Sequence, residues 1–195
     1  MKPHQNPFRV ERLEALAFRP QGTTWPELLA KLERLRFRAA VVGPDGTGKT
    51  TFLDELARRM PLLGARPIAL RLDPASPAEV RRRVRAAVAQ AASNDVVLLD
   101  GADHASRWEW MQLRHAARRA RGLVVTSHRP GLLPTLLETR TSAALLRELV
   151  SELAPAHATR LDAVIDEVLA RHRGDVRSAL LELFDHAAGL GPDPR

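Results

Sequence analysis

The chain has 195 residues, contains no cysteine, and carries a net charge of +7 at pH 7, with 45% hydrophobic residues. This length suits one globular domain with an appendage or two small domains, and the hydrophobic share excludes wholesale disorder. The lack of cysteine excludes disulfide frameworks and thiolate metal sites, which fits a reducing compartment. The N-terminus has no signal-peptide core and no apolar run approaches the ~20 residues of a membrane helix, so we expect a cytoplasmic protein without membrane association.

Apolar runs and helical periodicity alternate along the first two thirds of the chain. The pattern predicts strands at 37–43, 66–72, 95–103 and 122–128, with a short fifth strand at 135–141. It predicts helices at 49–60, 76–92 and 104–121. Each strand is a continuous apolar run, which indicates a mostly parallel five-stranded sheet covered by helices on both faces.

The 76–92 segment has its own start signal and apolar stripe. Ser76 is expected to cap this helix, with Pro77 in its first turn. One apolar stripe is expected to consist of Val80, Val84, Ala87, Val88 and Ala91.

The last third of the chain changes character. Three helical stretches are predicted at 142–153, 158–172 and 175–188, with Gly174 ending the second and Asp175 capping the third. We therefore expect an N-terminal helical segment at 1–36, an α/β core at 37–141 and a small helical lid at 142–190.

The segment "GPDGTGKTT" (43–51) follows a predicted strand and opens a helix, the context in which a phosphate-binding P-loop occurs. Glycines let backbone N–H groups cradle phosphate oxygens, and the helix N-terminus adds partial positive charge. Lys49 would reach the β- and γ-phosphates and Thr50 would bind Mg²⁺. Only three of the 30 basic residues are Lys, so a Lys at this position is informative. The expected nucleotide-binding residues are Gly43, Pro44, Asp45, Gly46, Thr47, Gly48, Lys49, Thr50 and Thr51.

Acidic residues follow the third predicted strand. Asp100 ends this strand and is the expected second metal-binding residue beside Thr50. The sequence continues Gly-Ala-Asp, so a general base is either Asp103, displaced by three residues, or missing. Polar residues Thr126, Ser127 and His128 end the fourth strand, and we expect Ser127 or His128 to contact the γ-phosphate. The alternative is that one of them caps the following turn.

The pattern resembles the AAA+ ATPases of the clamp-loader and origin-recognition type, over roughly residues 37–188. "GPDGTGKT" and "VVLLD" match their two nucleotide motifs, "HRPGLLPTLLETRT" looks like their stretch after the sensor strand, and "RHRGDVRSALLELFDHA" looks like their lid helix. The resemblance implies ATP and Mg²⁺ as cofactors, an Arg facing a neighbouring subunit (here Arg140), and a lid Arg reaching the γ-phosphate (here Arg177). It also implies that one strand separates the phosphate-loop strand from the Asp100 strand. These relatives place Glu directly after the metal-binding Asp, and its absence here puts fast hydrolysis in doubt.

Two other functions stay open at this point. The loop also resembles that of thymidylate kinase and related nucleotide kinases, in which the two motif strands are neighbours. A nucleotide-dependent binding module with little turnover would use the same loop. No base-specifying motif separates ATP from GTP, and nothing in residues 1–36 is diagnostic of an adenine pocket.

The partners suggested by the sequence are a second copy of the chain, another protein, or nucleic acid. Basic stretches at 81–85 and 114–121 could neutralise nucleic-acid phosphates or form solvated helix faces, and no aromatic residue lies within them. Trp108 and Trp110 are two residues apart and cannot share a helix face, so at most one is expected to be well buried.

Overall fold

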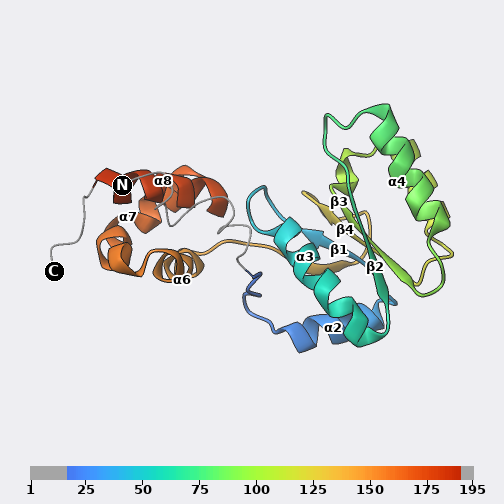
Figure 1. Ribbon diagram of the computed structural model, residues 1–195, viewed down its shortest axis with the longest axis horizontal. Coiled ribbons are helices and arrows are strands. Elements are labelled where there is room, and N and C mark those ends of the chain that lie inside the picture. The colour runs from blue at the N-terminus through green and yellow to red at the C-terminus, as the bar shows by residue number, and fades with distance from the viewer. Residues whose placement is uncertain (1–16, 190–195) are drawn as a thin grey trace. The chain divides into compact units, whose positions relative to one another are not determined.

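The computed structural model describes residues 17–189, so residues 1–16 of the predicted N-terminal segment and residues 190–195 lie outside the description. The described residues form two compact units, drawn in Figure 1. The core unit comprises residues 18–43 and 49–139. The helical unit comprises residues 140–189 together with residues 44–48.

The core unit is built on a five-stranded sheet in which every neighbouring pair is parallel. The strand order is β2-β3-β4-β1-β5, so β4 lies between β1 and β3. The strands are β1 (Arg38–Val42), β2 (Arg66–Arg71), β3 (Asp95–Asp100), β4 (Gly122–Ser127) and β5 (Thr135–Glu138). The predicted α/β fold with a five-stranded sheet is therefore confirmed.

Alternating strand residues face two separate apolar clusters. On one face, residues such as Val41, Leu98 and Val124 pack against α2 (Trp25–Arg34) and α3 (Lys49–Arg59). On the other face, Val42, Leu99 and Val125 pack against α4 (Ala78–Gln90) and α5 (Arg107–Ala116). The result is a three-layer arrangement, and burial on both faces explains why the central strands read as continuous apolar runs (Figure 1).

Helix α2 begins and docks for reasons that are visible in its sequence. Thr24 and Glu27 form a capping box, with each side chain accepting from the other's backbone N–H. Trp25 stacks on Phe52 of α3 at 5.1 Å between ring centroids, and Phe18 meets the same Phe52 ring edge-on. This aromatic cluster holds α2 against α3.

Two details of the predicted 76–92 helix are wrong. The residue preceding the first turn is Pro77, and the Ser76 hydroxyl instead accepts a hydrogen bond from the Asp73 N–H at 2.8 Å, which satisfies the preceding turn. Val80 lies outside the apolar stripe because α4 turns it toward solvent, whereas Val84 and Val88 are buried.

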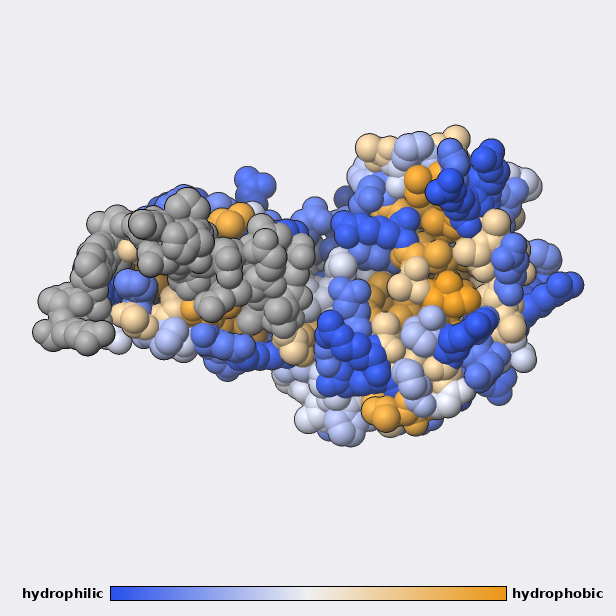
Figure 2. All heavy atoms as spheres, in the orientation of Figure 1, coloured by the Kyte–Doolittle hydropathy of each residue, from blue (hydrophilic) through white to orange (hydrophobic). Residues whose placement is uncertain are grey.

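On the view in Figure 2, apolar residues (orange) are interspersed among hydrophilic ones (blue) over the region of β2 and α4, where β2 forms an edge of the sheet.

The helical unit has its own apolar cluster. Helices α6 (Ala143–Leu153), α7 (Ala158–Arg171) and α8 (Val176–Gly189) contribute to it, and the short 3₁₀ turn η4 (Pro155–His157) separates the first two. Asp175 caps α8 by accepting from Ser178 N at 3.1 Å, as predicted. Helix α7, however, ends at Arg171, and the first left-handed residue after it is Arg173 (φ 53°), one position before the predicted Gly174 (φ 86°). Among residues 17–189, no helix is both long and apolar enough to cross a membrane.

The Asp95 side chain links the first residue of β3 to the first residue of β2. Its carboxylate accepts two hydrogen bonds from Arg66, at 2.6 and 2.8 Å, and a third from Ala92 N at 2.7 Å. The Arg66 hydrogen bond, followed by the Ala92 N–H, lowers the pKa of this carboxyl from 3.8 to about 2. A folded-state pKa below the unfolded value stabilises the protein above pH ~4, and this contribution disappears as the pH falls through about 2.

We therefore expect Asp95→Asn to lower the free energy of unfolding at pH 7 and to remove part of the acid dependence between pH 4 and 2. Chemical denaturation at a series of pH values measures both effects. Asp73→Asn serves as the control, because Asp73 is largely exposed and its pairing with Arg71 is a surface contact. Equal stability curves for the Asp95 variant and the unaltered protein would contradict this role.

Candidate functional site

The phosphate-loop segment begins where β1 ends. Gly43 N donates to Ser127 O of β4 at 3.1 Å, which continues the β1–β4 pairing into the loop. Lys49, the first residue of α3, donates from Nζ to Gly43 O at 2.7 Å. The Lys49 side chain thus runs along the loop toward Gly43, the first residue of the loop. In the presence of a nucleotide, its ammonium could bind phosphate oxygens in place of this carbonyl.

Residues 44–48 form a tight turn with two left-handed glycines. Gly46 and Gly48 have φ of 69° and 89°, which residues with a Cβ rarely adopt. Thr47 is buried and donates from its hydroxyl to Pro44 O at 2.8 Å, which closes the turn. This is the curled, Gly-dependent backbone that a phosphate cradle requires.

Asp100 lies at the carboxyl end of β3 and is held by two threonine hydroxyls. Thr50 donates to its Oδ2 at 2.8 Å, and Thr126 of β4 donates to its Oδ1 at 2.5 Å. The two residues predicted to bind metal are therefore in direct contact. The strand order accounts for this, because β4 adjoins both β1 and β3 and the carboxyl ends of parallel strands meet at one edge.

Thr126 is the residue that sequence reasoning passed over. It is buried, and its hydroxyl also accepts from Gly101 N at 2.7 Å, so it joins Asp100 to the backbone that follows. Thr126 is one of three polar residues, with Ser127 and His128, at the end of the fourth predicted strand. Recognising it as the residue that contacts Asp100 requires knowing that β4 pairs with β3. The register pairs Leu99 with Val125, which places Asp100 and Thr126 one step further along.

Gly101 occupies the position at which the resembled relatives have Glu. Its φ is 75°, and a Cβ built on it would lie 2.1 Å from Leu72 O, a backbone atom. Leu72 cannot easily move away because its N–H donates to Asp100 O at 2.9 Å. A side chain of any kind is therefore excluded at 101 unless the backbone shifts.

Asp103 lies beyond this turn, in the 3₁₀ turn η3 (Ala102–His104), and is paired with His128. Its Oδ2 accepts from His128 N at 2.9 Å and contacts His128 Nδ1 at 2.6 Å. Burial alone would raise the pKa of this carboxyl, but the hydrogen bonds from His128 outweigh it and the pKa is lowered. Asp103 therefore stays a carboxylate at neutral pH and fixes the His128 ring.

The remaining predicted residues lie as follows. The buried Ser127 donates from its hydroxyl to Arg129 O at 2.7 Å, within the turn after β4. Arg140 is exposed and follows β5, and Arg177 is exposed in the first turn of α8. The roles of these three residues remain predictions.

The strand order separates the two enzyme classes that the sequence left open. A strand between the phosphate-loop strand and the Asp100 strand is the AAA+ arrangement, whereas the two are neighbours in the nucleotide-kinase layout. A family model described as "ATPase family associated with various cellular activities (AAA)" matches residues 39–173, more than half of the chain. The chain belongs to the AAA family. The family to which it belongs is one of P-loop ATPases.

One of the solved structures that match this chain supports the fold. A variant of RuvB from Thermotoga maritima matches with a TM-score of 0.57 and 17% identity, over 89% of this chain and 65% of that one. PCH-2 from C. elegans matches with a TM-score of 0.42 and 12% identity, over 82% of this chain and 64% of that one, a likeness too low to support an argument. This AAA chain thus spans slightly less than two thirds of either structure. No curated protein matches the sequence.

The residues present fit the magnesium–nucleotide complex that the AAA family uses. Thr50 and Asp100 supply hard oxygen ligands in direct contact, and Mg²⁺ typically takes one or two protein oxygens together with phosphates and waters. Within residues 17–189 there is no cluster of three or more His, Asp or Glu side chains that would favour a fully protein-bound metal. When bound, Mg²⁺ would neutralise charge on the phosphates.

We expect the Thr126 hydroxyl to affect the rate of ATP hydrolysis as well as the free energy of unfolding. Thr126→Val removes the hydroxyl but keeps the shape, which leaves the partly buried Gly101 N–H without its acceptor and Asp100 without one donor. We expect the free energy of unfolding to fall by about 1–3 kcal/mol and Mg²⁺-dependent turnover to fall roughly 10–100-fold. Denaturant titration and a Mg²⁺ titration of ATP hydrolysis measure the two effects.

Thr139→Val is the matched control for Thr126→Val. Thr139 is also a buried threonine of the core unit, and its hydroxyl donates to Val42 O at 3.3 Å. This variant should lose stability but keep the Mg²⁺ dependence of turnover, and Thr126→Ser should restore turnover. If both valine variants show the same Mg²⁺ dependence, Thr126 does not position Asp100.

Proposed function

We propose that this AAA protein is an ATP-driven switch: ATP binding and hydrolysis change how α8 contacts the phosphate loop, and the chain assembles with further copies of itself. The single observation that carries this proposal is a backbone hydrogen bond from Val176 N to Gly46 O, at 3.2 Å. Gly46 belongs to the phosphate loop and Val176 is the first residue of α8. Nucleotide phosphates and α8 would therefore share one loop.

The cap of α8 supports the same point. A Cβ built on Gly46 would lie 1.9 Å from Asp175 Oδ1, so the loop and the cap residue are in tight contact. Phosphates entering the loop add negative charge next to the Asp175 carboxylate, which favours a rearrangement of this contact. Arg177, two residues further along, would then approach the γ-phosphate.

The chemistry of the switch would be divided among residues of the core unit. Lys49 would bind the β- and γ-phosphates, and Thr50 and Asp100 would hold Mg²⁺. The Asp103–His128 pair would orient the attacking water in place of the Glu that position 101 cannot hold. A carboxylate with a lowered pKa is a weak base, so this pair favours slow hydrolysis.

Assembly with a second copy would supply one more catalytic side chain, an arginine. Arg140 is an exposed residue that follows β5, and we propose that it reaches the nucleotide of a neighbouring copy. An Arg supplied in trans stabilises charge that develops during phosphoryl transfer. Hydrolysis would then depend on protein concentration.

The test of assembly is the rate of phosphate release per protein molecule across a dilution series. We expect this rate to rise with concentration and Arg140→Ala to lower it by on the order of 10³-fold. A mixture of Arg140→Ala and Lys49→Ala chains should recover activity, because some sites then combine an intact Lys49 with an intact neighbouring Arg140. Arg160→Ala, which alters another exposed arginine of the helical unit, should behave like the unaltered protein.

Two results would overturn the assembly proposal. A rate per molecule that does not change with dilution would remove the need for a neighbour. Tight ATP binding without turnover at any concentration would make the chain a nucleotide-dependent binding module.

A further inference from the structure

The outer face of α5 combines an exposed aromatic ring with exposed cations. Trp108 and Met111 are 66% and 61% exposed, respectively, although both are large apolar side chains. They are three residues apart and share a helix face with His115, while Leu113 points into the core. The expectation that at most one of the two neighbouring tryptophans is well buried is confirmed, since Trp110 packs against the core cluster only in part.

Arginines border this apolar centre. Arg107 and Arg114 of α5 are exposed, and so are Arg118 and Arg119 in the turn that follows the helix. Arg107 and Arg114 are seven residues apart, which places them on one stripe with Met111 and about 10 Å apart along the helix axis. No ion pair involves these four arginines within residues 17–189, so their charge is available to a partner.

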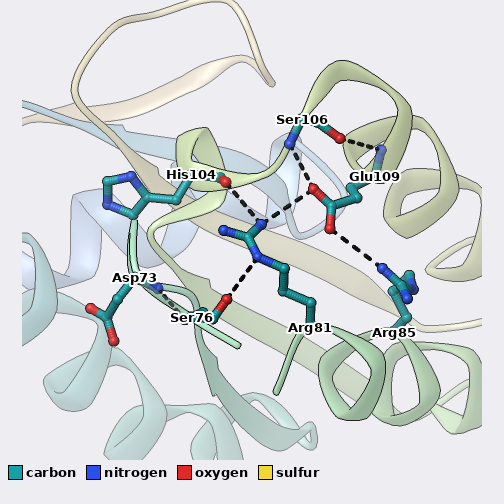
Figure 3. Close-up of polar contacts among 7 residues, drawn as sticks. All are labelled: Asp73, Ser76, Arg81, Arg85, His104, Ser106 and Glu109. Atoms are coloured by element: carbon teal, nitrogen blue, oxygen red, sulfur yellow. Dashed lines mark hydrogen bonds and ion pairs between the residues drawn. The ribbon is translucent and has the colours of Figure 1, made fainter. Parts of the chain in front are cut away.

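The one acidic residue of α5 does not offset this charge, as Figure 3 shows. The Glu109 carboxylate is turned toward α4, where it pairs with Arg81 at 3.2 Å and Arg85 at 3.4 Å. It also accepts from Ser106 N, and this backbone hydrogen bond is the main cause of its lowered pKa. Arg81 further donates to His104 O and Ser76 O, so Glu109 is fixed on the inner side of α5.

We propose that this face, defined by Arg107, Trp108, Met111 and Arg114, binds single-stranded nucleic acid. A planar indole that is two-thirds exposed offers a surface on which a base can stack, and neighbouring guanidinium groups can pair with backbone phosphates. The complementary partner must be negatively charged and must present flat apolar rings. A single strand meets both needs, whereas a duplex hides the faces of its bases. Sequence analysis did not predict this face because Trp108 lies outside the basic 114–121 stretch. The helical repeat of α5 is what places Trp108 near the first residues of that stretch.

This inference goes beyond the ATPase proposal, because none of these residues lies in the nucleotide site. Binding should therefore persist in Lys49→Ala, and failure of either proposal leaves the other standing.

The experiment is fluorescence anisotropy with labelled 15-nucleotide dT and rU strands and with a duplex of equal length, in 50 mM salt. We expect saturable binding to at least one single strand, and binding to the duplex at least about fivefold weaker. Trp108→Ala should weaken single-strand binding about fivefold or more, and Trp108→Phe should restore most of it. The double variant Arg107→Gln with Arg114→Gln should reduce the slope of log affinity against log salt by about 1.4.

Controls alter similar side chains elsewhere on the core unit. Leu62→Ala removes another exposed apolar side chain, and Arg34→Gln removes another exposed arginine. Both should bind like the unaltered protein. The proposal is overturned by an absence of strand binding, by affinity that is unchanged in Trp108→Ala, or by polyglutamate displacing the strand as well as unlabelled strand does. The last result would assign the face to an acidic protein.

Discussion

Lys49→Ala should lower kcat/KM for ATP hydrolysis by roughly 10²–10³-fold, the loss seen when one charge-stabilising donor is removed from an active site. Lys49 Nζ lies 2.7 Å from Gly43 O, at the start of the phosphate loop, and the truncated side chain leaves the phosphates without their ammonium. Titration calorimetry with ATP and phosphate-release assays on the variant and the unaltered protein measure the effect on binding and on turnover.

Lys31→Ala is the matched control for Lys49→Ala. Lys31 also donates from Nζ to a backbone carbonyl, that of Leu136, at 2.7 Å. It belongs to α2, so its loss should alter stability slightly and leave ATP binding unchanged. If the two variants bind and hydrolyse ATP equally well, Lys49 does not contact the nucleotide.

Gly101→Ala should lower the free energy of unfolding by at least about 3 kcal/mol. The left-handed backbone alone costs a non-glycine residue about 1–2 kcal/mol, and the clash of a Cβ with Leu72 O adds to this. Denaturant titration measures the loss. Gly22→Ala isolates the backbone contribution, because Gly22 has φ of 69° but no atom within 4 Å of the place that a Cβ would take, so only the smaller loss is expected there.

The same geometry predicts the behaviour of Gly101→Glu, which restores the acid of the resembled relatives. We expect this variant to be destabilised at least as much as Gly101→Ala and to hydrolyse ATP no faster than the unaltered protein. A stable Gly101→Glu protein with faster hydrolysis would contradict the role assigned to the turn.

The helices and strands could be predicted from the sequence more completely than the contacts of the candidate site. Strands that are buried on both faces produce continuous apolar runs, so the starts of all five strands could be predicted to within one residue. The third and fifth strands end at Asp100 and Glu138, three residues earlier than predicted. The helix start at Ser76 was wrong because its hydroxyl satisfies the Asp73 N–H instead, a competition between two local partners that the pattern does not resolve.

The contacts that build the site join residues far apart in the chain. Thr50 and Asp100 are separated by 50 positions, and Asp103 and His128 by 25. Both pairings depend on which strands are neighbours, which propensity and periodicity do not determine. The role of Gly101 depends on its close approach to Leu72, the residue that follows β2, and no local signal marks it.

The central claim is that this AAA protein hydrolyses ATP and does not transfer its phosphate to an acceptor. The most direct measurement is a simultaneous time course of ADP and free phosphate from MgATP, with and without a panel of nucleosides and nucleotides. The account predicts one phosphate released for each ADP formed, without any acceptor, and almost no product from Lys49→Ala. ADP that appears only with a nucleoside or nucleotide acceptor, without free phosphate, would contradict the account and identify a kinase.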